Sequence, residues 1–315
     1  MTAWIRQALV MALAALVLLG GARSTVFGQA DAAKAADTAA QLIDRGDLSG
    51  ARKTLDEALQ HYPRAAALYK IAAILEFKSG RLDAMRSALE RATEYDPNDP
   101  DSFLNLGLLD LGQGRYAQAV PVFKNFTRLK PQDAQGHLLL GRAYLNRNLN
   151  LEAIPEIRSA LALDPRLPLA HNDLGIAEST LGNNEEALEE FHQEIQINPS
   201  FGGAYLRAGT IELEHHHLPE AEELLRQATA RDPNVAPGHF HLGQCLLQRQ
   251  KSEAAETEFR QAIALDAKLI RAHYGLAQSL QAQGKKEEAR REFQLHSELL
   301  ERNRKSASGI AAARD

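Results

Sequence analysis

Residues 168–201 of the chain read PLAHNDLGIAESTLGNNEEALEEFHQEIQINPSF, and the fold is predicted from this stretch. Apolar residues recur at helical spacing on both sides of Gly182, and Pro199 closes the stretch. Glycine ends a helix easily because it adopts the left-handed conformation, whereas proline cannot continue a helix. The stretch therefore predicts two helices joined by a short turn and followed by a stop.

The same landmarks return every 34 residues, which is the spacing between Pro165 and Pro199. The prolines that share this phase are Pro63, Pro97, Pro131, Pro165, Pro199 and Pro233. A fixed period of this length indicates a stacked repeat array, because each short unit buries its apolar face only against its neighbours. The array is predicted to span residues 32–303, with units that begin at residues 32, 66, 100, 134, 168, 202, 236 and 270.

Two further positions keep the same phase and predict how the helices of one unit meet. Position 8 is always glycine or alanine, such as Gly175, and position 20 is almost always alanine, such as Ala187. Two small residues allow a close approach of antiparallel helices. Position 24 is always large and apolar, such as Phe191, and is expected to fill the space beside that contact.

These features resemble the tetratricopeptide repeat, whose 34-residue pattern contains Leu-Gly, then A-x3-F, then proline. The pattern is present in Leu174-Gly175, Ala187, Phe191 and Pro199, and the resemblance covers most of the chain. It implies an all-α fold: a right-handed α-solenoid of about eight helix-turn-helix units, or about sixteen antiparallel helices. It also implies a non-catalytic scaffold for protein–protein interaction.

The resemblance further implies that the first helices of the units line a groove. Positions 5 and 9 fall on one helical stripe that is mainly apolar, which suits an extended peptide or a partner helix. With Asn105 at position 6, the predicted groove residues are Lys70, Ile74, Leu104, Asn105, Leu108, Leu138, Arg142, Asn172, Ile176, Leu206, Thr210, Phe240, Gln244, Tyr274 and Gln278. Alternatively, many of these side chains pack on the adjacent first helix. A clamp for C-terminal carboxylates, known in some family members, is not predicted, because only Lys70 and Asn105 match its five positions.

No catalytic motif is present, since the chain lacks G-x-S-x-G, a Gly-rich phosphate loop and H-E-x-x-H. The three histidines at 215–217 have no carboxylate or cysteine partner at metal-ligand spacing. With 36 basic and 41 acidic residues, the chain has no basic stripe for nucleic acid. We therefore expect no enzyme, no metal, no cofactor and no nucleic-acid partner. A metal-binding protein or an enzyme is the alternative of another class.

The N-terminus is predicted to be a targeting segment. Arg6 precedes an unbroken apolar run over residues 8–19, which is short for a membrane-spanning helix. Residues 1–30 are therefore expected to be a cleaved signal peptide, and the mature chain to be secreted or periplasmic. In the alternative, this segment stays as an outward-facing membrane anchor, the only expected membrane contact, of an envelope assembly or secretion factor. Residues 304–315 are predicted to be a disordered tail.

Overall fold

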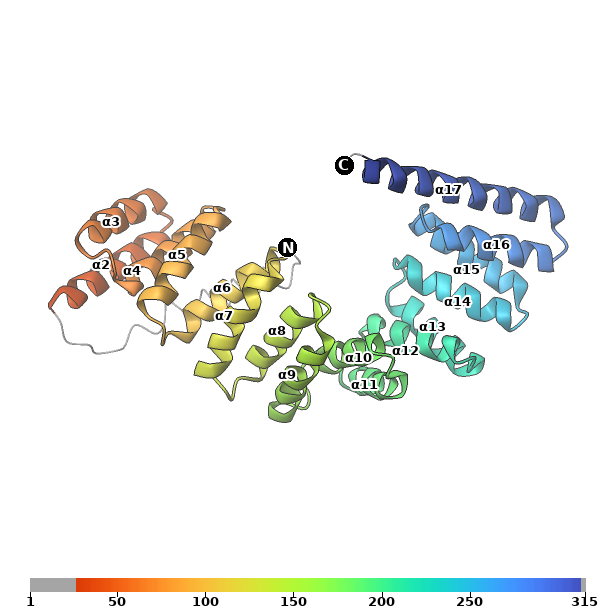
Figure 1. Cartoon of the computed structure of the whole chain (residues 1–315), viewed down its shortest axis with the longest axis horizontal. Helices are drawn as coiled ribbons and strands as arrows, with labels where there is room; N and C mark the ends of the chain where they lie inside the picture. Colours follow the sequence, from red (N-terminus) through yellow and green to blue (C-terminus); the bar gives the residue numbers. More distant parts are fainter. Residues whose placement is uncertain (1–26, 313–315) are drawn as a thin grey trace. The chain divides into compact units, whose positions relative to one another are not determined.

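The computed structural model describes residues 27–312, and every regular element in this part of the chain is an α-helix. The sixteen helices form eight consecutive hairpins (Figure 1). They fall into two compact units, Met1–Leu167 and Pro168–Asp315. The predicted all-α solenoid of helix-turn-helix repeats is therefore confirmed. Residues 1–26, which include most of the predicted signal peptide, lie outside the described part.

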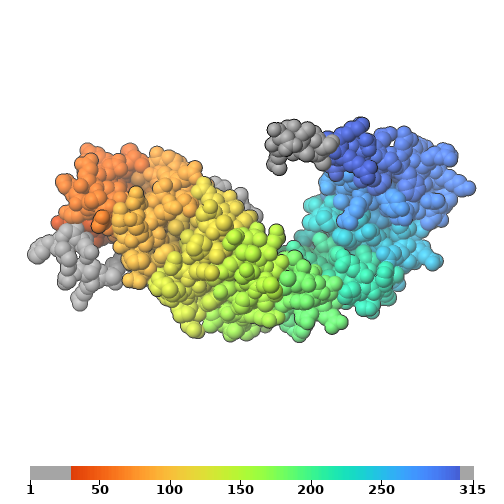
Figure 2. Space-filling model, viewed as in Figure 1, coloured from red at the N-terminus to blue at the C-terminus, as the bar shows by residue number. Residues whose placement is uncertain are grey.

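Each unit contains four hairpins. The N-terminal unit consists of α2 (Phe27–Asp44) with α3 (Leu48–His61), α4 (Ala66–Lys78) with α5 (Leu82–Tyr95), α6 (Pro100–Gly112) with α7 (Tyr116–Leu129), and α8 (Ala134–Leu145) with α9 (Asn150–Leu163). The C-terminal unit consists of α10 (Ala170–Thr180) with α11 (Asn184–Ile197), α12 (Gly202–Glu214) with α13 (Leu218–Arg231), α14 (Ala236–Gln248) with α15 (Ser252–Leu265), and α16 (Ile270–Ala282) with α17 (Lys286–Ala312). Within each unit, side chains fill the space between successive hairpins (Figure 2). Among residues 27–312, no helix combines the length and the apolar character needed to cross a bilayer.

Three helix boundaries differ from the prediction. Helix α2 begins at Phe27, before residue 32, and α10 begins at Ala170 because Leu169 has a φ of 66°, outside the helical range. Helix α17 continues to Ala312, within residues 304–315, for which a disordered tail was predicted.

The turn inside every hairpin contains one residue in the left-handed conformation. In five hairpins this residue is glycine, with φ between 72° and 85°, as at Gly182. In the other three it is Asn148, His216 or Gln250, with φ between 57° and 62°. The conformation therefore belongs to the repeat, and glycine is only the residue that adopts it with the least strain.

The two helices of a hairpin meet where position 24 lies directly on position 8. A Cβ atom added to Gly175 would lie 2.7 Å from the Phe191 ring, and one added to Gly243 would lie 2.9 Å from Phe259. Both phenylalanines are fully buried. The sequence predicted the close approach but placed the large residue beside it, whereas the structure places that residue on the small one.

Position 4 of the first helix bonds to the end of the preceding hairpin. The Tyr69 hydroxyl donates to the Pro63 carbonyl at 3.0 Å, and His239 Nε2 lies 3.0 Å from the Pro233 carbonyl. His239 Nδ1 also lies 2.7 Å from Glu258 Oε2 on the second helix of its own hairpin. His239 therefore connects both to the previous repeat and across its own hairpin.

Ion pairs also join consecutive hairpins, and both acidic and basic residues of the second helix take part. In the N-terminal unit, Arg86 on a second helix bonds to Asp110 on the next first helix at 2.8 Å. In the C-terminal unit, Glu256 on a second helix bonds to Lys285 of the next hairpin at 2.8 Å. Burial alone would raise the pKa of Glu256, but hydrogen bonds from Lys285, Arg260 and Gln283 outweigh it and lower the pKa to about 2.

The contact between positions 8 and 24 predicts the effect of enlarging Gly175. We expect Gly175→Leu to lower the free energy of unfolding by about 1–3 kcal/mol, because the new side chain collides with Phe191. Thermal and denaturant unfolding measure the change, with Thr180→Leu on the exposed face of α10 as the control. Equal stability of the two variants would contradict the contact.

The ion pair of Glu256 predicts a pH-dependent effect of Lys285→Gln. Because the pKa of Glu256 is lowered in the folded state, its stabilising contribution is present above the ordinary value of 4.5 and is lost as the pH falls towards 2. Lys285→Gln should therefore lower stability by about 1 kcal/mol at pH 7 and progressively less as the pH falls from 4.5 towards 2. Unfolding curves across this range measure the difference. Lys286→Gln removes the same charge from an exposed position and should show no such pH dependence.

Candidate functional site

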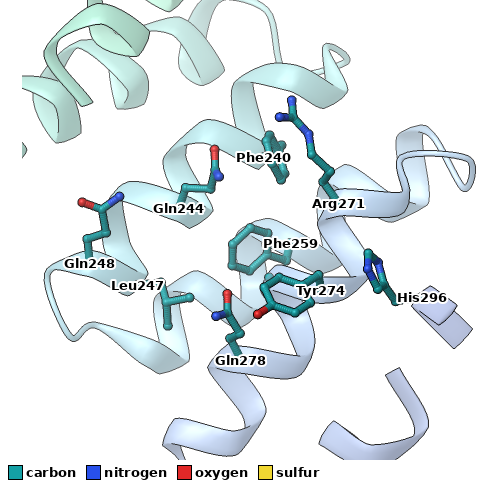
Figure 3. A pocket seen from close by; sticks show the side chains of 10 residues that line it. Phe240, Gln244, Leu247, Gln248, Phe259, Arg271, Tyr274, Gln278 and His296 are labelled. Atoms are coloured by element: carbon teal, nitrogen blue, oxygen red, sulfur yellow. The ribbon is translucent and has the colours of Figure 1, made fainter. Parts of the chain in front are cut away.

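A cavity of about 320 Å³ lies between the first helices α14 and α16 of the C-terminal unit. Its base is apolar, because Phe240 is only 2% exposed and Phe259, from α15, is fully buried. Figure 3 shows amide side chains around this base. The residues that line the cavity are Phe240, Gln244, Leu247, Gln248, Phe259, Arg271, Tyr274, Gly275, Gln278 and His296.

Helical spacing explains why these side chains meet. On α14, Phe240, Gln244 and Gln248 follow one another at four-residue intervals, so they share one face of the helix. On α16, Tyr274 and Gln278 share the opposite wall in the same way. Figure 3 shows the two walls with the Phe259 ring between them.

The aromatic rings hold the open wall in place. The Tyr274 ring lies 5.6 Å from the Phe293 ring and 5.3 Å from the His296 ring, measured between centroids. Nevertheless Tyr274 is 45% exposed. Within residues 27–305, no hydrogen bond engages the Tyr274 hydroxyl or the Gln278 amide, so both can bond to an occupant of the cavity.

The same positions form a second cavity, of about 230 Å³, two repeats earlier. It lies between α10 and α12, with Ile176, Leu206 and Thr210 in the places of Gln244, Tyr274 and Gln278. Its base contains Phe191 where the first cavity has Phe259. The groove of the C-terminal unit is therefore hollowed at repeating, equivalent positions.

The two cavities bring together seven of the predicted groove residues, and the others are placed differently. The seven are Ile176, Leu206, Thr210, Phe240, Gln244, Tyr274 and Gln278. Five others are buried: Ile74, Asn105, Leu108, Leu138 and Asn172. Of the rest, Lys70 forms an ion pair with Asp99 at 3.1 Å, and Leu104 and Arg142 are half-buried.

The sequence prediction missed several lining residues, of which Arg271, Gln248 and His296 carry polar groups. Arg271 is at position 2 and Gln248 at position 13, and both positions face the groove in the resembled repeat. Including these two positions would have found them. His296 comes from the second helix α17, and no periodic signal of the first helices could have indicated it.

Other reactive groups are engaged elsewhere. His217 Nδ1 lies 2.7 Å from Glu212 Oε2, and His216 lies 3.3 Å from Gln248 Oε1. In the part of the chain that the structure describes, no group of three or more His, Cys, Asp or Glu side chains is arranged to hold a metal ion. Cys245 is buried, and burial raises the pKa of its thiol, so it is a poor nucleophile.

Comparison with known protein families agrees with the repeat described above. Profiles described as tetratricopeptide repeat match residues 42–104, 104–168, 206–270 and 270–294. Among curated protein sequences, no match is found.

Solved structures share the fold at low sequence identity. Pseudomonas aeruginosa pilF is 19% identical over 66% of this chain and 97% of its own, with a TM-score of 0.58. The APC/C hetero-tetramer Cut9–Hcn1 is 18% identical over 78% of this chain and 48% of its own, with a TM-score of 0.56. YrrB, described as a TPR protein with an unusual peptide-binding site, is 19% identical over 59% and 96%, with a TM-score of 0.50.

Proposed function

The chain belongs to the tetratricopeptide repeat family, and from this premise we propose that it is a non-catalytic scaffold that binds a peptide segment of a protein partner. The proposed site is the groove of the first helices in the C-terminal unit. The observation that carries the proposal is the cavity between α14 and α16, in which an apolar base is surrounded by accessible amide groups.

The chemistry of this cavity suits an extended peptide. The side-chain amide of Gln278 offers both a donor and an acceptor, so it can bond to the N–H and C=O groups of a peptide backbone. The base of Phe240 and Phe259 can bury one large apolar side chain of the same peptide. Since the helices are already packed, little ordering of the scaffold is needed when the peptide binds.

The polar groups of the cavity also support a binding role over a catalytic one. They are amides, a phenol, a guanidinium and one imidazole. The imidazole is that of His296, whose Nδ1 donates to the Ile270 carbonyl at 3.0 Å. Among the residues that line this cavity, no serine or cysteine stands as a nucleophile beside a base.

The proposed groove is tested by the double variant Tyr274→Ala with Gln278→Ala. A random peptide library displayed on phage is first selected on the full chain. The selected peptides should bind the double variant at least about tenfold more weakly, because it loses one ring wall and one amide. The helical content should be unchanged, whereas the loss of the Tyr274 ring contacts with Phe293 and His296 should lower the melting temperature.

The control carries Gln261→Ala and Gln294→Ala, two exposed amides on the second helices α15 and α17. It should bind the peptides as the wild type does. Equal binding by the Tyr274/Gln278 variant would show that the groove is not the site.

We further propose that this scaffold works outside the cytoplasm after residues 1–30 are removed. The support is the sequence of this segment, in which Arg6 precedes the apolar run at residues 8–19. The mass of the protein recovered from its native host should be smaller by roughly thirty residues. An intact mass in the membrane fraction would instead favour the anchored envelope assembly or secretion factor.

A further inference from the structure

We propose that the cavity between α14 and α16 selects a peptide in which an aromatic or large aliphatic side chain stands next to a carboxylate, and that Arg271 binds this carboxylate. The inference rests on the proposed function and adds the chemistry of the occupant.

The charge of the cavity is opposite to that of the chain. The chain has a net charge of −5, but the residues that line the cavity include Arg271 and His296 and neither aspartate nor glutamate. An anionic group is therefore attracted to this part of the groove.

Arg271 is available for such a group. Its guanidinium carbon lies 5.2 Å from the centroid of the Phe240 ring, and its side chain is exposed (Figure 3). Within the described residues, no carboxylate forms an ion pair with it, whereas Arg86 and Arg260 are each paired with two carboxylates. Contact with the ring orients the guanidinium and leaves its N–H donors for a bidentate bond to a carboxylate.

The field of Arg271 is also felt by a neighbouring side chain. Burial lowers the pKa of His241, and the positive charge of Arg271 lowers it further. His241 is therefore favoured as the neutral ring and does not compete with Arg271 for an anion. On the other wall, the Nδ1–H of His296 is used by the Ile270 carbonyl, which leaves Nε2 for an occupant.

The position of Arg271 also determines which peptide side chain is favoured next to the carboxylate. The guanidinium lies over Phe240, and Phe240 forms the apolar base together with Phe259, at a centroid distance of 6.1 Å. A carboxylate held at Arg271 therefore brings the next side chain of the peptide to this base. An aromatic or large aliphatic side chain gains most there, since it buries the most apolar surface.

The equivalent cavity between α10 and α12 is an internal comparison. Gly203 occupies the position of Arg271, and the arginine of this cavity, Arg207, donates to the Gly203 carbonyl at 3.0 Å. Glu214 also lines this cavity. Its arginine is thus already bonded and a carboxylate is nearby, so selection for an acidic peptide is expected only at the α14–α16 cavity.

The test selects the same random peptide library on the full chain and on Arg271→Glu. The wild type should enrich peptides in which Phe, Tyr, Trp or Leu is adjacent to Asp or Glu. Arg271→Glu should enrich Lys or Arg at that place instead. Arg291→Glu makes the same change of charge at an exposed position of α17 outside the cavity, and it should select as the wild type does.

A second measurement assigns the carboxylate to Arg271. For one selected acidic peptide and its Gln or Asn analogue, the affinities are measured with wild type and Arg271→Gln. The wild type should prefer the acidic peptide by about tenfold, and Arg271→Gln should abolish this preference. An equal loss for both peptides would overturn the assignment to Arg271.

The outcomes separate the two proposals. Selected peptides without an acidic residue that still require Tyr274 and Gln278 would overturn this inference and leave the scaffold function in place. Selected peptides that bind independently of Tyr274 and Gln278 would overturn the proposed groove itself. A library that yields no binding peptide would contradict the groove as a peptide site.

Discussion

The fit of one large side chain over one small residue is the contact on which the rest of the structure depends. Phe259 shows why, because its ring lies against Gly243 of its own hairpin and against Gly275 of the next. One buried side chain thus fixes the spacing of two helices within a repeat and also the position of the following repeat. A single hairpin cannot bury all of its apolar surface alone, so the stack within each unit depends on the repetition of this contact and of the apolar contacts around it.

Directional bonds add what apolar packing does not supply. Packing sets distances, but the hydroxyl of Tyr69 and the imidazole of His239 each bond to a proline carbonyl of the preceding hairpin, which fixes the register between repeats. The ion pairs Arg86–Asp110 and Glu256–Lys285 connect neighbouring hairpins with opposite signs. The two pairs differ both in sign and in the repeat position of the partner, so the repeat does not fix the charge of these contacts.

The periodic parts of the fold could be predicted from sequence, because their signals are local. Glycine at the turn and proline after the second helix act through their own backbone restrictions, wherever the array continues. The start of α10 could not be predicted in this way. The backbone N–H of Leu169 bonds to Glu194 Oε1 at 3.1 Å, and this buried carboxylate lies 25 positions further along the chain. A helix boundary that depends on such a distant contact cannot be recognised from the local sequence pattern.

The sequence predicted the helical stripe that forms the groove, but not which of its side chains are accessible to solvent. Accessibility depends on the side chain and its neighbours more than on its position in the repeat. Position 5 is buried at Phe240 and exposed at Tyr274. Position 9 also differs from repeat to repeat. Where it is apolar in the N-terminal unit, at Ile74 and Leu108, the side chain is buried.

In the C-terminal unit, position 9 lines a cavity both where it is polar, at Thr210, Gln244 and Gln278, and where it is apolar, at Ile176. An amide buried without partners would destabilise the fold, so Gln244 and Gln278 keep contact with solvent beside the buried Phe259. The polar residues that can bond to a peptide therefore lie at the rim of the space that the peptide would fill.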